Sequence, residues 1–190
     1  MQPKVGNVEF FGSHKLGFLA QNPVFSFLKD TLKGDLEFAL SKNKLPLRLI
    51  EEGFKKYPMF EALRVLLNMN PLDLSGGERA KAAVFKLLIL GRDILILDEP
   101  EKHLDKKSIN ELSGIIKELS AYSVSFIIVS HSPDFIYNTA DSINELREGK
   151  FTKKTVREYF PERSETSLYK AIKGAAIPLF DCSEAEVDNG

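Results

Sequence analysis

The sequence predicts an α/β fold: a mostly parallel sheet flanked by helices, with a helical subdomain inserted into it. Two short apolar runs, residues 94–97 and 124–130, are typical of fully buried parallel strands. Between them, residues 106–119 carry apolar side chains at helical spacing. A strand, a helix and a strand in this order form a parallel α/β unit.

The first part of the chain predicts two strands followed by helices. Residues 8–11 and 16–20 are short apolar stretches separated by a turn, and the second stretch ends at Gln21. The residues that follow have apolar side chains at helical spacing, which predicts the inserted helical subdomain at 24–73. Breaks between its helices are expected at Gly34, at 44–46 and at 57–58.

The later part of the chain predicts two more helices and a hairpin. A helix is expected at 79–90, with Gly91 as its stop signal, and a short helix at 132–138. Residues 142–146 and 151–153 are expected to pair as strands across a turn.

The composition predicts one ordinary globular core. A domain is expected at 1–160, followed by an extension at 161–190 whose acidic end is partly disordered. Lys and Arg total 26 against 27 for Asp and Glu, so nothing favours a nucleic-acid partner. The single cysteine, Cys182, cannot form an internal disulfide.

No apolar run approaches the roughly 18 to 20 residues that cross a bilayer. The N-terminus also lacks the apolar segment of a secretory signal. These features predict a cytoplasmic protein whose association with a membrane is peripheral.

The pentapeptide Leu-Ser-Gly-Gly-Glu at residues 74–78 lies where a helix is expected to begin. Gly76 and Gly77 let backbone N–H groups approach a phosphate, and the helix dipole favours its negative charge. Ser75 adds a hydroxyl donor. An ordinary glycine turn that caps a helix is the alternative interpretation.

Two adjacent carboxylates, Asp98 and Glu99, follow a predicted buried strand. Open α/β sheets bind ligands at the carboxyl ends of their strands. At this position Asp98 can hold a hydrated Mg²⁺ ion, and Glu99 can polarise or deprotonate the water that attacks a γ-phosphate. In the alternative interpretation the pair merely begins a surface loop.

His131 and Gln21 each follow a strand, so they are expected at the same sheet edge as Asp98 and Glu99. A histidine there can donate a hydrogen bond to a phosphate oxygen, although a structural role is its alternative. The amide of Gln21 can meet the magnesium ion or the attacking water.

The order of these motifs resembles the nucleotide-binding domain of ABC ATPases over nearly the whole of residues 5–155. The resemblance implies a P-loop NTPase-like fold and an ATPase that uses ATP and Mg²⁺. It also implies that Ser75, Gly76, Gly77 and Glu78 form the signature motif, which closes over the γ-phosphate of ATP held by the opposite subunit.

The same resemblance implies roles for the residues at the sheet edge. Asp98 matches the Walker B magnesium residue, and Glu99 matches the catalytic base. Asp105 matches the D-loop aspartate, His131 the switch histidine, and Gln21 the Q-loop glutamine that serves the magnesium site and the attacking water.

Residues 21–23 and 70–77 are most similar to the ATPases of energy-coupling-factor and cobalt-type importers. This likeness implies a second ATPase subunit, identical or different, and a transmembrane subunit that docks on the Q-loop and the helical subdomain. It places the chain at the cytoplasmic face of the membrane. Phe25, Phe27 and Phe38 either line the docking groove or belong to the subdomain core.

The sequence departs from the family pattern in three places. No Gly-x4-Gly-Lys-Ser/Thr occurs, and the resemblance aligns Met1 just after the P-loop helix, so the N-terminal part of the domain is expected to be missing. Without the P-loop strand, the sheet is expected to expose an apolar edge. Glu78 replaces the usual glutamine, and Glu101-Lys102-His103 replaces a Thr-x-Gly pattern.

Two explanations compete for the missing P-loop. The chain is either a shortened version of a complete ATPase subunit or a P-loop-less, non-hydrolysing partner that donates its signature motif. The first is favoured because Asp98, Glu99 and His131 act with a P-loop in the same subunit. Soluble ABC proteins of the translation-factor or SMC repair type are further alternatives, but this chain lacks their charged linker and heptad coiled coil.

Overall fold

The computed structural model describes residues 14–161, and the chain divides between Phe135 and Ile136 into two compact units. The strand predicted at 8–11 and the extension predicted at 161–190 lie outside these residues, except for Pro161. The division into a domain at 1–160 and an extension therefore stays a prediction. No helix in the described part is long and apolar enough to cross a membrane.

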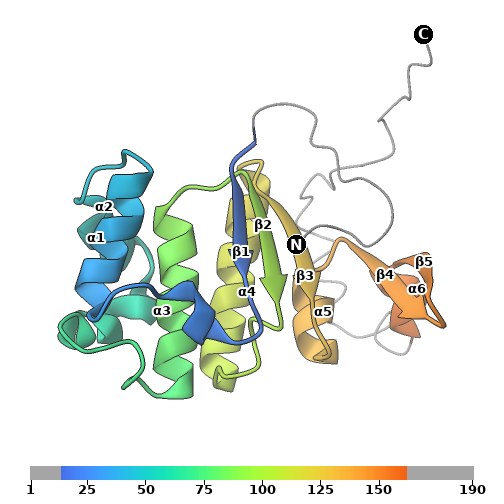
Figure 1. The fold of residues 1–190 in the computed structure, drawn as a ribbon. Helices are drawn as coiled ribbons and strands as arrows, with labels where there is room; N and C mark the ends of the chain where they lie inside the picture. The colour runs from blue at the N-terminus through green and yellow to red at the C-terminus, as the bar shows by residue number, and fades with distance from the viewer. Residues whose placement is uncertain (1–13, 162–190) are drawn as a thin grey trace, which may run out of the picture. The chain divides into compact units, whose positions relative to one another are not determined.

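The first unit is built on a parallel sheet of three strands in the order β1-β2-β3 (Figure 1). The strands are β1 (Leu16–Leu19), β2 (Ile94–Asp98) and β3 (Ser125–Val129). In register, Phe18 lies beside Ile96, and Ile96 beside Ile127. The strands predicted at 16–20, 94–97 and 124–130 are confirmed to within a residue at each end.

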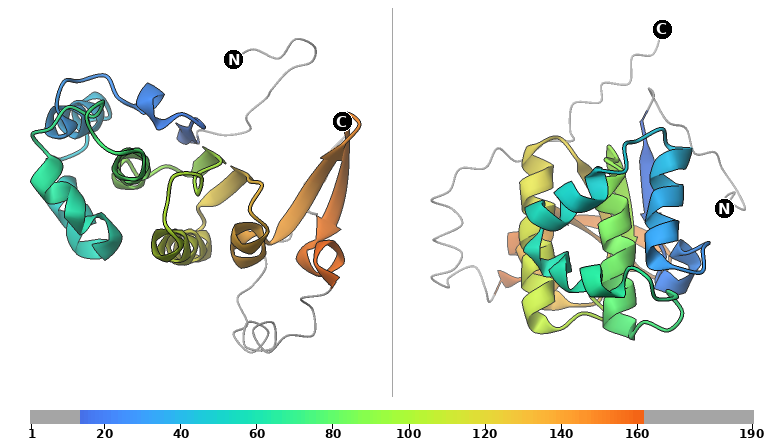
Figure 2. Two further views of the ribbon diagram at one scale, coloured as in Figure 1. Left: turned by 90° about the horizontal axis from the view of Figure 1, so that it is seen from below. Right: turned by 90° about the vertical axis from the view of Figure 1, so that its left-hand side faces the viewer.

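Two helices cover one face of this sheet (Figure 2). They are α3 (Gly76–Ile89) and α4 (Lys106–Ala121), which confirm the helices predicted at 79–90 and 106–119. Alternate residues of the strands, such as Leu95 and Leu97, are buried in one core with Phe85 and Leu112. Because side chains alternate along a strand, this packing uses only one face.

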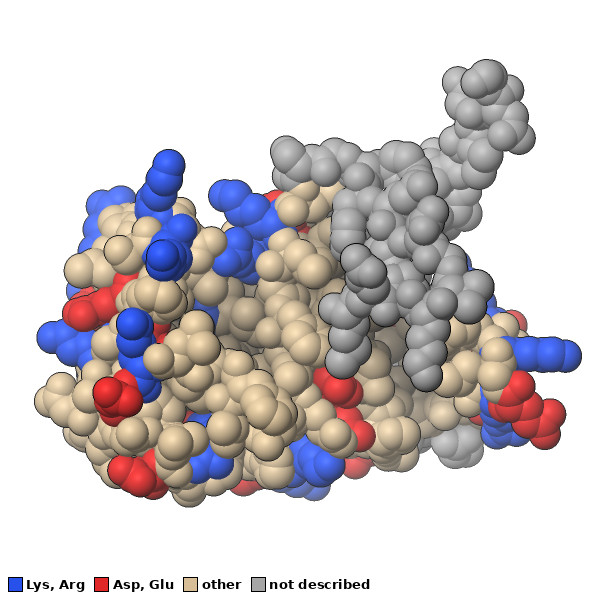
Figure 3. Space-filling view, viewed as in Figure 1, with Lys and Arg blue, Asp and Glu red and all other residues tan. Residues whose placement is uncertain are grey.

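The opposite face of the sheet is apolar and exposed. Leu16 and Phe18 on β1 and Ile127 and Val129 on β3 are exposed, and Phe18 exposes 55% of its surface. In Figure 3, which views this side, uncharged residues fill the middle of the visible surface. These exposed residues lie on the two edge strands of the sheet, and their side chains point to the face where a parallel sheet ordinarily carries helices.

The inserted stretch is helical, as expected. It contains the 3-10 segments η1 (Pro23–Ser26) and η2 (Pro58–Leu66) and the helices α1 (Leu32–Lys42) and α2 (Leu49–Lys56). The break predicted at Gly34 is wrong, because Gly34 lies in the first turn of α1. Its N–H donates to the Thr31 hydroxyl, which caps the helix at 3.1 Å.

A buried ion pair joins the inserted stretch to the sheet layer. Asp35 on α1 is fully buried, and its carboxylate lies 2.5 Å from the Lys86 ammonium on α3. The same carboxylate accepts a hydrogen bond from the Leu28 backbone at 2.7 Å, and Lys86 also donates to the Ser26 carbonyl. Asp35 thus holds together α1, α3 and the segment that follows Gln21.

The helix α5 (Pro133–Thr139) leads into the second unit, where β4 (Ser142–Arg147) pairs antiparallel with β5 (Lys150–Thr155). The predicted short helix and hairpin are confirmed. A short helix, α6 (Val156–Tyr159), was not predicted, although the Thr155 and Glu158 side chains form a capping box there. Tyr137, Ile143 and Phe160 form the small core of this unit.

Candidate functional site

The carboxyl ends of the three parallel strands meet at one edge of the sheet. Gln21 follows β1, Asp98 ends β2 with Glu99 directly after it, and His131 follows β3. The Gln21 amide donates to Glu99 Oε2 at 2.7 Å, and His131 Nε2 lies 3.5 Å from Glu99 Oε1. The structure therefore brings Gln21, Glu99 and His131 together as the sequence predicts.

Glu99 is held in an unusual backbone conformation. Its φ angle of 48° lies in the left-handed region, which is costly for a residue with a side chain and is found most often at functional sites. Its N–H still donates to the Val129 carbonyl at 2.9 Å, so the residue remains attached to the end of β3. The strained turn directs the chain away from the sheet immediately after β2.

The electrostatic surroundings of Glu99 favour its ionised form. The hydrogen bond from Gln21 lowers the pKa of the Glu99 carboxyl most, and the Lys102 ammonium, 3.0 Å away, lowers it further. His131 contributes in the same direction. Glu99 is thus an anion with one carboxylate oxygen toward Gln21 and Lys102 and the other toward His131.

Asp98 is partly buried and lines a small depression with Gln21, Glu99 and His103. No cluster of three or more His, Cys, Asp or Glu side chains with a metal-binding arrangement occurs within residues 14–161. Mg²⁺ in phosphate-transfer sites characteristically takes one or two protein oxygens and completes its shell with water and phosphate. Asp98 with the Gln21 amide fits that kind of site.

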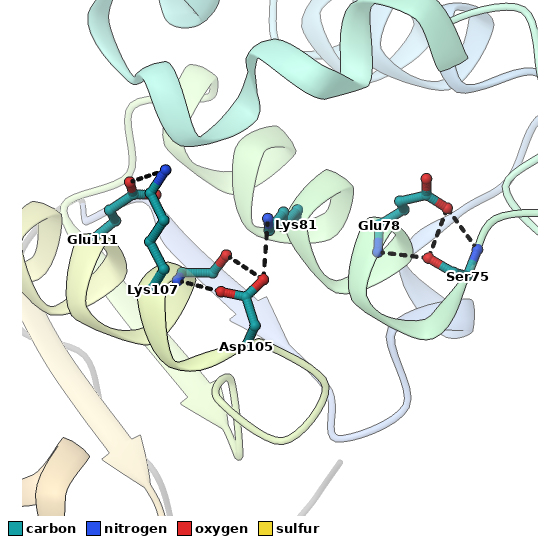
Figure 4. A network of polar contacts seen from close by, with 7 residues as sticks. Ser75, Glu78, Lys81, Asp105, Lys107 and Glu111 are labelled. Atoms are coloured by element: carbon teal, nitrogen blue, oxygen red, sulfur yellow. Dashed lines mark hydrogen bonds and ion pairs between the residues drawn. The ribbon is translucent and has the colours of Figure 1, made fainter.

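The predicted signature motif caps α3. The Ser75 hydroxyl accepts from the Glu78 N–H at 3.3 Å, and the Ser75 hydroxyl and N–H both donate to the Glu78 carboxylate, at 2.7 and 2.9 Å (Figure 4). These bonds lower the pKa of Glu78, the serine hydroxyl most of all. Ser75 and Glu78 therefore close a capping box at the helix start.

Gly77 has a packing reason to be glycine in addition to the predicted one. A Cβ atom at Gly77 would lie 3.0 Å from the backbone oxygen of His103, closer than ordinary contacts allow. A Cβ atom at Gly76 would lie 3.7 Å from Nδ1 of the His103 ring, which is an ordinary contact distance. The loop after Glu99 thus packs directly against the signature motif.

Asp105 begins α4 as its N-cap. Its carboxylate accepts a hydrogen bond from the Ser108 N–H at 2.8 Å, which is the main cause of its lowered pKa. Lys81 on α3 lies 3.9 Å from the same carboxylate, as Figure 4 shows. The predicted D-loop residue therefore connects the starts of α3 and α4.

Sequence reasoning gave no role to Lys102 or Lys81, which contact Glu99 and Asp105. Lys81 follows Glu78 by three positions on the predicted helix, which places both on one helix face. The sequence carries no comparable signal for Lys102. Within the described residues, no hydrogen bond joins Ser75 to Glu99. The signature motif and the sheet-edge cluster are thus two separate groups in one chain.

Comparison with known proteins gives consistent relatives. A family model described as "AAA domain, putative AbiEii toxin, Type IV TA system" matches residues 16–136. The energy-coupling factor transporter ATP-binding protein EcfA2 of Caldanaerobacter subterraneus subsp. tengcongensis is 30% identical over 184 residues, covering 87% of this chain and 63% of that protein. "Putative ABC transporter ATP-binding protein PH0132" of Pyrococcus horikoshii is 32% identical over 165 residues, covering 79% and 62%.

Solved structures share the fold. The cbiO1 protein of Clostridium perfringens, described as part of the ABC transporter complex cbiONQ, matches with a TM-score of 0.64 and 21% identity, covering 85% of this chain and 64% of that chain. The ATP-binding cassette MJ0796, a dimer bound to ADP and Pi, matches with a TM-score of 0.64 and 22% identity, covering 76% and 64%.

The fold is that of the ABC type of P-loop ATPase domain. The matching family model spans well over half of the chain, and the chain belongs to that AAA-domain family. Its curated relatives are named ABC transporter ATP-binding proteins. Proteins of the energy-coupling-factor type are among its relatives. The chain spans about half to two thirds of the length of the curated relatives it matches.

Proposed function

We propose that this chain is the ATP-hydrolysing subunit of an ABC transporter, of the energy-coupling-factor or cobalt-type importer class. The observation that carries the proposal is the convergence of Gln21, Lys102 and His131 on the Glu99 carboxylate at the sheet edge. A carboxylate held ionised at the carboxyl edge of a parallel sheet, where such folds bind ligands, is suited to act as a general base.

In the proposed reaction, Glu99 accepts the proton of the water that attacks the γ-phosphate of ATP. Gln21 holds Glu99 Oε2 at 2.7 Å, which leaves Oε1 for that water. His131 lies 3.5 Å from Oε1 and is exposed, so it can donate to the transferring phosphoryl oxygens as negative charge grows on them.

Asp98 and Gln21 are the proposed magnesium ligands. The bound ion supplies charge neutralisation at the phosphates. Asp98 ends β2 immediately before Glu99. Of these two neighbouring carboxylates, Asp98 is proposed to bind the metal ion and Glu99 to accept the proton.

The signature residues Ser75, Gly76, Gly77 and Glu78, together with Asp105, are proposed to act on ATP held by a second ATPase subunit. No Gly-x4-Gly-Lys-Ser/Thr occurs in residues 1–190, so the phosphate cradle for either nucleotide is proposed to come from polypeptide outside them. The start of α3 presents N–H groups and the Ser75 hydroxyl, which suit a phosphate once the capping box opens. ATP-driven dimerisation of the two ATPase subunits is proposed to power transport.

A transmembrane subunit is proposed to dock beside Gln21, at the cytoplasmic face of the membrane. Phe25 and Leu28 in the segment after Gln21 are exposed, and so is Leu72. Of the phenylalanines considered from sequence, Phe27 and Phe38 are partly buried, and lysine ammonium groups lie over their rings. Phe25 is therefore the phenylalanine that supports the docking proposal.

The test is ATP hydrolysis by the complex purified through a tag on this chain. Glu99→Gln should reduce turnover by roughly 100-fold or more, because the amide cannot accept the proton. Glu111→Gln, which makes the same change at a carboxylate that pairs with Lys107 on α4, should leave turnover near wild type. Equal turnover by the wild-type and Glu99→Gln complexes would sink the proposal.

A second candidate is a partner subunit that dimerises and donates its signature motif without hydrolysing ATP. The capped start of α3, where Ser75, Gly76 and Gly77 form a group separate from the sheet-edge cluster, supports it. In that case Ser75→Arg in the complex should reduce turnover at the partner's nucleotide, whereas Glu99→Gln should not.

A further inference from the structure

The tripeptide Glu101-Lys102-His103 is fixed in the structure at both of its ends. Glu101 is buried and accepts a hydrogen bond from the Ser130 hydroxyl, just before His131. At the other end, the His103 backbone oxygen lies against Gly77, where a Cβ atom would come within 3.0 Å. The middle residue, Lys102, is therefore held between two anchored neighbours.

Backbone hydrogen bonds define how the tripeptide turns. The Lys102 N–H donates to the Glu99 carbonyl at 3.2 Å, and the Leu104 N–H donates to the Glu101 carbonyl at 3.0 Å. The left-handed φ of Glu99 starts this turn. As a result, the Lys102 side chain returns toward Glu99, and its ammonium lies 3.0 Å from Glu99 Oε2.

The two carboxylate oxygens of Glu99 have different partners. Oε2 accepts from the Gln21 amide at 2.7 Å and from Lys102 at 3.0 Å. Oε1 faces His131 at 3.5 Å. Two donors on one oxygen restrict rotation of the carboxylate more than one donor would, and they keep the second oxygen on the His131 side.

We propose that Lys102 is a positioning residue, which orients the Glu99 carboxylate so that Oε1 faces the attacking water. This inference rests on the proposed role of Glu99 as the general base. Lys102 acts through Glu99 and does not bind the nucleotide. Its loss should therefore slow turnover without weakening ATP binding.

The experiment compares Lys102→Met, Lys102→Arg and a control, Lys107→Met, in the ATPase complex purified through a tag on this chain. Lys107 is a more exposed lysine that pairs with Glu111 on α4 at 3.9 Å (Figure 4). Lys102→Met should lower kcat about fivefold with KM for ATP unchanged, which is the scale of one partly exposed ion pair. Lys102→Arg should restore most of kcat, and Lys107→Met should match the wild type.

A double-mutant comparison tests whether Lys102 acts through Glu99. Adding Lys102→Met to Glu99→Gln should leave the residual single-turnover rate unchanged. A wild-type kcat in Lys102→Met, or the same fivefold loss in the Glu99→Gln background, overturns the inference about Lys102. The proposed function fails separately, if Glu99→Gln itself does not reduce turnover.

Discussion

Glu99 is the residue on which the polar contacts of the sheet edge converge. Its neighbours come from the ends of two other strands, β1 and β3, and from the following turn, so the site depends on the fold as a whole. Gln21 makes the largest contribution to its lowered pKa. The carboxylate therefore stays ionised at neutral pH and well into the acid range.

This lowered pKa predicts a pH profile. A general base works while ionised, so the activity that depends on Glu99 should persist as pH falls and disappear only below the usual carboxyl pKa of about 4.5. Gln21→Ala removes the main cause of the shift and should move the acid limb of kcat for the ATPase complex to higher pH. Glu111→Gln on α4 is the control. An unmoved acid limb in Gln21→Ala would contradict this explanation.

The capping box at Ser75 and Glu78 predicts a stability effect. Ser75→Ala should cost about 1 kcal/mol in the free energy of unfolding, because α3 loses its cap. Since the folded pKa of Glu78 is lowered, the bonds to its carboxylate stabilise the fold above about pH 4.5 and weaken as pH falls through the folded value. Urea unfolding of the wild type and of Ser75→Ala, at pH 7 and below pH 4.5, measures the cost of losing the cap and how that cost depends on pH. Equal costs at the two pH values would argue against the capping box.

At the scale of elements, the strands were predictable because short apolar runs end in Gln21, Asp98 and Ser130. The break expected at Gly34 failed because the Thr31 cap and the burial of Asp35 outweigh the low helix propensity of one glycine. The α6 helix is one turn long, too short for a periodic pattern.

The site was predictable in part for a related reason. Parallel strands place their ends at one edge, so the proximity of Gln21, Glu99 and His131 followed from topology. The contact of Lys102 with Glu99 depends on the left-handed φ of Glu99, and no residue pattern in the sequence marks that conformation.

The pair of Asp35 and Lys86 predicts how strongly α1 is attached to α3. Asp35→Ala should cost about 3 kcal/mol, because it leaves a buried ammonium and the Leu28 N–H without the carboxylate. Replacing both residues, as Asp35→Leu with Lys86→Met, should recover part of that loss.

Glu37→Ala is the matched control for this prediction. Glu37 lies on the same helix, in an exposed pair with Lys33 at 3.9 Å, and its loss should change stability by less than about 0.5 kcal/mol. Urea unfolding of the wild type and the three variants gives the comparison. A similar small effect for Asp35→Ala and Glu37→Ala would show that the buried pair does not hold the helices together.

At the scale of the whole molecule, the uncovered sheet face predicts self-association of the purified 190-residue chain. Phe18 and Ile127 are neighbours of Ile96 in register and are both more than half exposed. Burying apolar surface of this kind is worth roughly 25 cal/mol per Å². Phe18→Ser with Ile127→Thr should therefore shift light scattering toward the monomer.

Val65→Ser is the control for the sheet face, because Val65 is equally apolar and 85% exposed but lies on η2. It should leave the association unchanged. If Val65→Ser dispersed the chain as well as the double variant did, the sheet face would not be the site of association.

We propose that this chain contributes catalytic and signature residues, while the P-loop that holds most of the nucleotide lies outside residues 1–190. Calorimetric titration with Mg-ATP, of the 190-residue chain alone and of the purified ATPase complex, tests it directly. The predicted result is no measurable binding by the chain alone and binding by the complex that Ser75→Arg weakens. Binding of Mg-ATP by the chain alone, as tight as by the complex, would contradict the claim.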